Sequence, residues 1–340
     1  MNAAAHPAIA LALGSLPVLI LLAFFVLLDS YKMVRPRSAA ILVLVGSCAA
    51  CVSLATNMML RREIGIAFPI LARYVAPMLE ETLKGAFIVF LLRTRRIGFL
   101  VDAAIAGFAV GAGFAAVENV VYFVLLPGQT LTLWMVRGFG TAVMHGTVTA
   151  IMAVTAQSLS ERGGARWWVY LPGWVLATFL HSMFNHFFLA PDLSAVLLLV
   201  ALPLLFLLLF QLSGRSTRAW LGAGFDTDAE LLGLIHSGTV SDSRVGKYLG
   251  TLKASFSPAV VADMLCLLRL KLELSIRAKG ILLMRQSGFE APLDPKIGER
   301  FAEISYLEKS IGPTGLLALS PVLHMSDRDL WQLNMLRGKT

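Results

Sequence analysis

The first two thirds of the chain are dominated by apolar stretches long enough to cross a lipid bilayer. A helix of about 20 apolar residues spans the roughly 30 Å hydrocarbon layer. Stretches of this length predict an all-α fold, a polytopic membrane helical bundle of about seven transmembrane helices. The predicted spans are Pro7–Leu28, Ala39–Leu60, Ile64–Leu92, Val101–Leu126, Leu131–Gln157, Trp168–Leu189 and Leu193–Leu212.

The charged residues divide the chain into two parts. Overall 57% of residues are hydrophobic and 15% charged, but the first 212 residues carry 21 charged side chains and the last 128 carry 29. We therefore expect a transmembrane domain over residues 1–212 and a water-soluble, mostly helical accessory domain over 213–340. This composition excludes a soluble enzyme, a disordered chain and a secreted disulfide scaffold. The net charge of +8 is not gathered into a dense basic run, which argues against nucleic-acid binding.

The basic residues between the spans predict the orientation in the membrane. Lys and Arg cluster in the loops around residues 32–37, 93–96 and 162–166 and after the seventh span, whereas the intervening loops carry only Arg61 and Arg62. Cytoplasmic loops are the ones enriched in Lys and Arg. We expect a multi-pass protein of the cell (inner) membrane, with the N-terminus outside and the C-terminal domain in the cytoplasm.

The third predicted span is irregular. Ile64–Leu92 is longer than a bilayer requires and contains Pro69, Arg73 and Pro77. Proline inside a helix removes a hydrogen bond and kinks the axis. The segment is therefore predicted to be either one kinked helix or partly re-entrant.

Several predicted spans contain ionisable residues, which are costly within lipid and are therefore candidates for a functional site. At about 1.5 Å of rise per residue, two acids and two imidazoles lie roughly 16 to 25 Å from the predicted cytoplasmic ends of their helices. A similar depth on four helices predicts one shared site. The polar residues are Glu80, Glu81 and Lys84 in the third span, Glu118 and Asn119 in the fourth, His145 in the fifth, and His181 and Asn185 in the sixth.

The spacing along the fourth span indicates which way its acid points. Gly107, Gly111, Phe114 and Glu118 follow one helical stripe, and the two glycines form a small-xxx-small pattern that lets membrane helices approach closely. Glu118 is therefore expected to face the interior of the bundle. On the third span, Glu80 and Lys84 are four residues apart and are expected to form an ion pair.

Other polar residues in the spans receive structural interpretations. Arg137 and His186 are explained by contact with a neighbouring helix or by reaching toward the membrane surface. Asp102 stands at the start of the fourth span, where it is expected to cap the helix.

The chemistry of the polar set leaves alternatives open. A glutamate can activate water for amide hydrolysis, and imidazoles or an asparagine amide can stabilise the oxyanion. Two histidines and a glutamate also form an ordinary zinc-binding set, here Glu118, His145 and His181 contributed across helices. Buried Glu, His and Lys could instead carry protons in a transporter, although we find no inverted repeat of the kind typical of carriers. A catalytically inert scaffold, in which the C-terminal part carries the function, is a third possibility.

At these residues the sequence resembles the PrsW family of intramembrane proteases, relatives of the CAAX prenyl endopeptidases within the CPBP clan. The resemblance covers about residues 69–189, with one motif in each successive span. The motifs are E-E-x-x-K at Glu80, Glu81 and Lys84, F-x-x-x-E-N at Phe114, Glu118 and Asn119, a histidine at His145, and H-x-x-x-N at His181 and Asn185.

The resemblance implies an intramembrane endopeptidase that hydrolyses peptide bonds of membrane-anchored proteins. It implies catalytic roles for Glu80, Glu81, Glu118, His145 and His181, by a glutamate or a metal mechanism. It also suggests regulated proteolysis, with an anti-sigma factor as a candidate substrate. The chain departs from the prenyl-processing branch, because Glu118 stands where that branch has histidine and Lys84 replaces an arginine one residue later.

The sequence thus predicts an intramembrane protease in which Glu81 is the general base and Glu80 pairs with Lys84. Glu118 is expected to share proton handling or metal ligation, and His145 and His181 to stabilise the oxyanion or hold a divalent metal such as zinc. Lys84, Asn119 and Asn185 are expected to support them. The alternative is a proton-coupled membrane transporter that uses the same buried groups.

Overall fold

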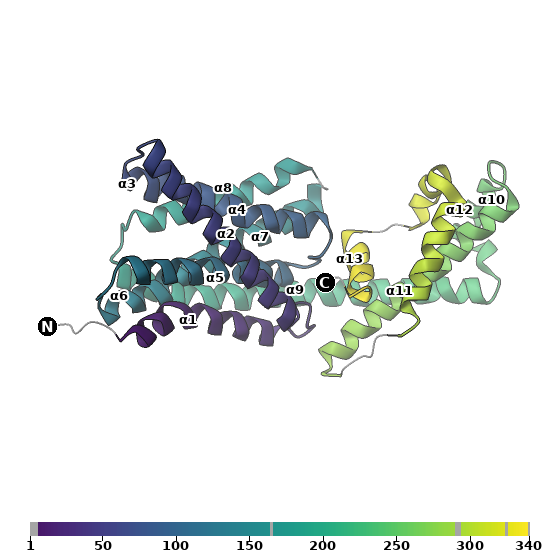
Figure 1. The fold of residues 1–340 in the computed structure, drawn as a ribbon. Helices are drawn as coiled ribbons and strands as arrows, with labels where there is room; N and C mark the ends of the chain where they lie inside the picture. Colours follow the sequence, from purple (N-terminus) through teal and green to yellow (C-terminus); the bar gives the residue numbers. More distant parts are fainter. Residues whose placement is uncertain (1–5, 164–165, 290–293, 324–325, 339–340) are drawn as a thin grey trace. The chain divides into compact units, whose positions relative to one another are not determined.

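The fold is helical throughout the part of the chain that the computed structural model describes, residues 6–163, 166–289, 294–323 and 326–338 (Figure 1). It divides into two compact units, Met1–Ser213 and Gly214–Thr340, with the division inside a long helix that belongs to both. The first unit contains α1 (Pro7–Leu28), α2 (Pro36–Glu63), α3 (Phe68–Ile70), η1 (Leu71–Val75), α4 (Ala76–Arg93), α5 (Leu100–Leu125), α6 (Leu131–Val136), η2 (Arg137–Ala142), α7 (Val143–Gly163), η3 (Trp167–Tyr170), α8 (Leu171–Asn185) and the first part of α9 (Pro191–His236). The second contains the rest of α9, η4 (Val240–Asp242), α10 (Arg244–Leu252), α11 (Pro258–Gln286), α12 (Ile297–Leu323) and α13 (Asp327–Leu336).

Within the described residues, five helices are long and apolar enough to cross a membrane, which supports a multi-pass membrane protein. They are α1, α2, α5, α9 and the continuous helix formed by α6, η2 and α7. The predicted third and sixth spans correspond to the segment from α3 to α4 and to α8, and neither is among the five. The first is rich in charged residues and the second has only 15 residues. The count of seven spans therefore stays a prediction.

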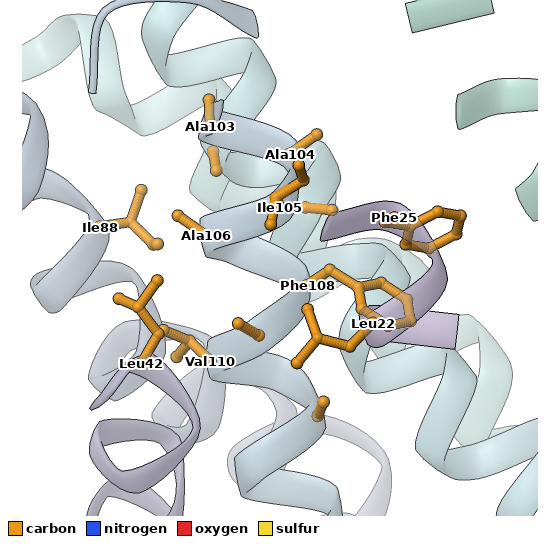
Figure 2. Close-up of a cluster of buried hydrophobic side chains, with 14 of the residues drawn as sticks. Leu22, Phe25, Leu42, Ile88, Ala103, Ala104, Ile105, Ala106, Phe108 and Val110 are labelled. Atoms are coloured by element: carbon orange, nitrogen blue, oxygen red, sulfur yellow. The ribbon is translucent and has the colours of Figure 1, made fainter. Parts of the chain in front are cut away.

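Helix α5 forms the centre of the first unit. It packs against α1, α2 and α7. Figure 2 shows its residues Ala103–Ala106, with Phe108 and Val110, between Leu22 and Phe25 of α1 and side chains of α2 and α4. Most α5 side chains in this region are alanine or glycine, so three neighbouring helices can come close to its backbone. Asp102 accepts hydrogen bonds from the backbone N–H groups of Gly98 and Phe99 at 2.8 and 2.7 Å, which confirms its predicted role at the start of the helix.

Two glycines set the distance between α5 and α7. A Cβ atom added to Gly107 or Gly111 would collide with the carbonyl oxygen of Thr149 or His145, respectively. Side chains larger than hydrogen would therefore push the two helices apart. This confirms the close approach predicted from the small-xxx-small spacing, and it places Glu118, two turns further along α5, beside α7.

The predicted third span is irregular in a different way from that expected. The helix begins at Phe68, not Ile64, and Pro69 lies in its first turn, where a missing N–H costs nothing. The irregularity is a π-helical turn, η1, that immediately precedes α4. A second π-helical turn, η2, precedes α7, and the sequence did not indicate it. Such turns often occur at functional sites.

The second unit is built on α11. This helix packs against α12 and α13, and it buries leucine and other apolar side chains along most of its length. Helix α12 is broken at Gly312, whose backbone φ of 72° lies in the left-handed region that favours glycine. The unit also buries Lys279, whose ammonium lies 2.7 Å from Asp228.

Candidate active site

Four helices of the first unit bring the predicted polar residues into one cluster. All of the contributing residues except Glu80 and Glu118 are buried. The cluster consists of Glu80, Glu81 and Lys84 from α4, Glu118 and Asn119 from α5, His145 and Thr149 from α7, and His181 from α8, joined by Arg137 from η2.

Glu81 is the most enclosed member of the cluster. Its Oε1 atom accepts from Lys84 Nζ at 2.5 Å and lies 2.9 Å from His181 Nδ1. Its Oε2 atom lies 3.5 Å from the hydroxyl of Thr149. The side chains of Glu81 and Lys84 are 0% exposed, so both charges depend on these partners.

The predicted ion pair between Glu80 and Lys84 is wrong. Lys84 pairs with Glu81, three residues before it, and not with Glu80, four residues before it. Both spacings bring side chains together on a helix. Helix packing decides between the two spacings. Glu81 and Lys84 lie where α4 contacts α7 and α8, whereas Glu80 faces the cleft that is described below.

His145 lies between a lysine and a glutamate. Lys84 Nζ is 3.2 Å from its Nδ1 atom, and Glu118 Oε2 is 2.8 Å from its Nε2 atom. A lysine ammonium can only donate and a carboxylate can only accept. The two contacts therefore fit a neutral imidazole that accepts at Nδ1 and donates from Nε2.

His181 presents a nitrogen to Glu80. Its Nδ1 atom lies 2.9 Å from Glu81, so this nitrogen carries the proton that the carboxylate accepts. In a neutral ring the Nε2 atom then holds a lone pair, and it lies 3.9 Å from Glu80 Oε2. The ring centroids of His145 and His181 are 4.8 Å apart in an edge-to-face arrangement.

Arg137 belongs to the cluster, although the sequence predicted a structural role for it. Its Nη2 atom lies 3.3 Å from Glu118 Oε1, and its Nε atom donates to Asn119 Oδ1 at 2.7 Å. Its guanidinium also lies over the ring of Tyr122, 3.7 Å from the centroid. Arg137 precedes His145 by eight residues, about two helical turns, and this spacing could have revealed it.

The hydrogen bonds of Asn119 and Asn185 go to backbone carbonyls and to Arg137, not to the glutamates and histidines of the cluster. Besides Arg137, Asn119 contacts α1, where its amide donates to the carbonyl of Gly14 at 2.5 Å. The amide of Asn185 donates to the carbonyl of Ala72 in η1 at 2.9 Å. A π-helical turn departs from the regular hydrogen-bond pattern of an α-helix. The hydrogen bond from Asn185 connects a carbonyl of η1 to α8.

A cleft of about 230 Å³ leads to two of the carboxylates. It is lined by residues of α2, of the segment from α3 to α4, and of α5. Glu80 and Glu118 line it, and their side chains are 13% and 25% exposed, respectively, whereas that of Glu81 is 0% exposed. A molecule in the cleft therefore meets Glu80 and Glu118 and not Glu81.

The donor set fits a divalent metal ion. Glu80, His145 and His181 offer ligand atoms that all lie within 4.8 Å of one another, and two imidazoles with one carboxylate are a common catalytic zinc set. His181 Nε2 is available, and the carboxylate of Glu81 on the other ring nitrogen is a typical partner of a ligand histidine. His145 would have to exchange one of its present bonds. Glu118, which the sequence placed among the ligands, lies against His145 Nε2 instead.

The fold and the site together define a multi-pass helical membrane protein with a buried cluster of glutamates and histidines. The chain belongs to the PrsW family of intramembrane metalloproteases, whose sequence profile matches residues 35–210, just over half of the chain. The match includes α2 through α8 and so contains every residue of the cluster. No curated protein and no solved structure gives a significant match to the chain.

Proposed function

We propose that this protein is an endopeptidase that cleaves membrane-anchored proteins at the buried glutamate and histidine cluster of its first unit. One observation carries the proposal: a cluster otherwise closed by α4, α5, α7 and α8 opens to a cleft through Glu80 and Glu118. Membership of a metalloprotease family supports the reaction class.

The exposure of the carboxylates suggests how the roles are divided. Glu118 lines the cleft, so it can reach a water molecule beside a bound peptide, and we assign it the role of general base. Glu81 was expected to be the base, but its side chain is 0% exposed, whereas that of Glu118 is 25% exposed. Glu81 is better placed to orient His181 and to neutralise Lys84.

The proposed reaction is the hydrolysis of one peptide bond. The oxygen of water attacks the carbonyl carbon, and Glu118 accepts the proton that water loses. Glu118 then returns this proton to the leaving nitrogen as the C–N bond breaks, so the products are a carboxyl and an amine. Arg137, 3.3 Å from Glu118, and His145, 2.8 Å from it, hold the carboxylate in place during both transfers.

A divalent metal would be held by Glu80, His145 and His181. When bound, such an ion polarises the peptide carbonyl and makes a bound water more acidic. Glu81 and Glu118 would act as the carboxylate partners that orient the two ligand histidines.

The proposals for the substrate and for the orientation in the membrane rest on the sequence. The substrate is a membrane-anchored protein, with an anti-sigma factor in a regulated pathway as a candidate suggested by the family resemblance. The distribution of Lys and Arg supports our proposal that the protein lies in the cell (inner) membrane, with its N-terminus outside and its C-terminal domain in the cytoplasm.

Cleavage by the purified full-length protein in liposomes tests this function. Single-span membrane proteins serve as substrates, and Glu118→Gln and His181→Ala are compared with wild type. Glu63→Gln is the control, because Glu63 ends α2 away from the cluster, is 66% exposed and pairs with Arg62. We expect wild type and E63Q to cleave at equal rates and the two site variants to be at least about 100-fold slower.

Two outcomes would overturn the proposal. Equal cleavage by wild type and all three variants would show that Glu118 and His181 are not catalytic residues. Absence of cleavage together with a proton flux across the liposome membrane that E118Q abolishes would identify a proton-coupled carrier instead.

A further inference from the structure

We infer that Arg61 selects substrates by pairing with an acidic residue that lies about five residues from the cleaved peptide bond. The inference rests on the proposed function, because it concerns how a substrate lies in the cleft that leads to Glu80 and Glu118. It adds a specificity determinant that lies outside the glutamate and histidine cluster.

The cleft has a rim and a floor. Arg61 in the last turn of α2 and Phe68 at the start of α3 line it at one end, and Glu80 and Glu118 line it at the other. Glu80 follows Phe68 by twelve positions along the helical segment, which corresponds to roughly 18 Å at 1.5 Å of rise per residue. An extended peptide advances about 3.3 Å per residue, so roughly five residues bridge this distance.

The walls between rim and floor are mostly apolar. Besides side chains of α2 such as Leu54 and Met58, they include Leu71, Phe114, Val117 and Val121. Such walls suit an unwound apolar segment of a membrane-anchored protein. They offer no charged side chain between the rim and the two glutamates, so an acidic residue of the substrate finds a cationic partner in the cleft lining only at the rim.

Arg61 is the charge at the rim that lacks an acidic partner. Its guanidinium lies 5.5 Å from the centroid of the Phe68 ring, and within the described part of the chain it makes no ion pair. The next residue, Arg62, is paired with Glu63 at 3.6 Å, and its side chain is 87% exposed and outside the cleft. The two neighbouring arginines therefore differ in whether they line the cleft and whether they already have an acidic partner. Arg62 is a matched control for Arg61.

An acidic substrate residue complements Arg61 and also fixes which end of the apolar segment lies at the rim. With the acid at the rim, the substrate enters from the membrane face at which α2 ends, and its apolar part runs toward the glutamates. The competing use of Arg61 is to bind the phosphate of a lipid headgroup, since basic residues at helix ends reach for the membrane surface.

The test is a charge exchange between enzyme and substrate in liposomes. Wild type, Arg61→Glu and Arg62→Glu cleave a single-span substrate that carries Glu five residues from the cut bond, and the same substrate with Lys at that position. We expect R61E to cleave the Glu substrate about tenfold more slowly than wild type in kcat/KM, and the Lys substrate to restore its rate. R62E should behave as wild type with both substrates.

Three outcomes would overturn the inference. One is an equal effect of R61E and R62E, and another is a loss in R61E that the Lys substrate does not restore. The third is a loss that appears only in liposomes with anionic lipid, which would assign Arg61 to the lipid phosphate. Failure of wild type to cleave either substrate would contradict the proposed function itself and is distinguishable from all three.

Discussion

Two buried lysines, one in each unit, have closely similar immediate surroundings. Lys84 in the first unit lies 2.5 Å from Glu81, and Lys279 in the second lies 2.7 Å from Asp228. Each ammonium also lies over an aromatic ring, 4.6 and 5.2 Å from the ring centroid, respectively. Each side chain is at most 3% exposed. The two ion pairs are therefore similar in length and in the burial of the lysine, although the carboxylate of Asp228 is 19% exposed and that of Glu81 is 0% exposed.

They differ in the groups to which the ion pairs are connected. The pair in the first unit is extended by two imidazoles, His145 and His181, and through them to carboxylates that line a cleft. The pair in the second unit is extended by the hydroxyl of Ser275 and the amide of Gln332. Imidazoles can exchange protons or bind a metal near neutral pH, whereas a hydroxyl and an amide serve mainly as hydrogen-bonding groups.

The comparison shows that a buried ion pair does not by itself mark a reaction site. Such a pair is costly to form and strongly destabilising to break wherever it occurs. The features that distinguish the first unit are the histidines next to the pair and the carboxylates that a substrate can reach. Variants can test whether this distinction holds.

The largest difference is expected from removing each lysine. Lys84→Met leaves Glu81 without its cationic partner at a fully buried position, and breaking such pairs costs about 3 to 5 kcal/mol. We expect cleavage to fall at least about 100-fold. Lys279→Met should destabilise the second unit and change cleavage less than about twofold. Cleavage rates in liposomes, with thermal unfolding of each variant, measure both effects, and a similar loss of cleavage in both would remove the distinction.

The amount of metal bound by histidine variants tests which histidines are metal ligands. We expect a chelator to abolish cleavage, and zinc to restore it, because Glu80, His145 and His181 offer a complete ligand set. His181→Ala should lose the bound metal, as measured by elemental analysis of the purified protein. His186→Ala is the control, because His186 lies directly after α8 and contacts Ser182 and Tyr74 outside the cluster. Retained metal in H181A would contradict the ligand assignment.

Glu81→Gln tests whether Glu81 positions His181 or carries out the proton transfer. A glutamine keeps the shape and one acceptor oxygen, so we expect metal affinity to fall about 10-fold to 100-fold, as is usual for partners of ligand histidines. Added metal should then restore most of the cleavage. Loss of cleavage with unchanged metal affinity would instead make Glu81 the general base and return it to the role predicted from the sequence.

The smallest effect concerns glycines at equivalent helical positions in the two units. Gly111→Ala places a methyl group against the carbonyl oxygen of His145, and we expect a destabilisation of about 1 to 3 kcal/mol. Gly280→Ala in α11 meets no atom within 4 Å and should stabilise by about 0.5 to 1 kcal/mol. Chemical denaturation checks the two signs, and a stabilising Gly111→Ala would contradict the close approach of α5 and α7.

Much of the site could be predicted because lipid makes polar residues conspicuous. Glu81, Glu118, His145 and His181 stand out in apolar stretches, and equal depth on four helices predicted the cluster that the structure contains. The glycine stripe of α5 predicted its approach to α7. By contrast, the π-helical turn η2 was not predicted. Arg137 lies two turns from His145, but it was expected only to contact a neighbouring helix or to reach toward the membrane surface.

The sequence by itself determined which residues lie inside the membrane part and on which faces of long helices they stand, because helical periodicity and the cost of charge in lipid are local properties. Only the tertiary structure decided which of two adjacent glutamates pairs with Lys84 and which carboxylates face the cleft. Successive helical residues point about 100° apart, so Glu80 and Glu81 meet different neighbours. That choice depends on how α4 is rotated against α7 and α8, and packing sets the rotation.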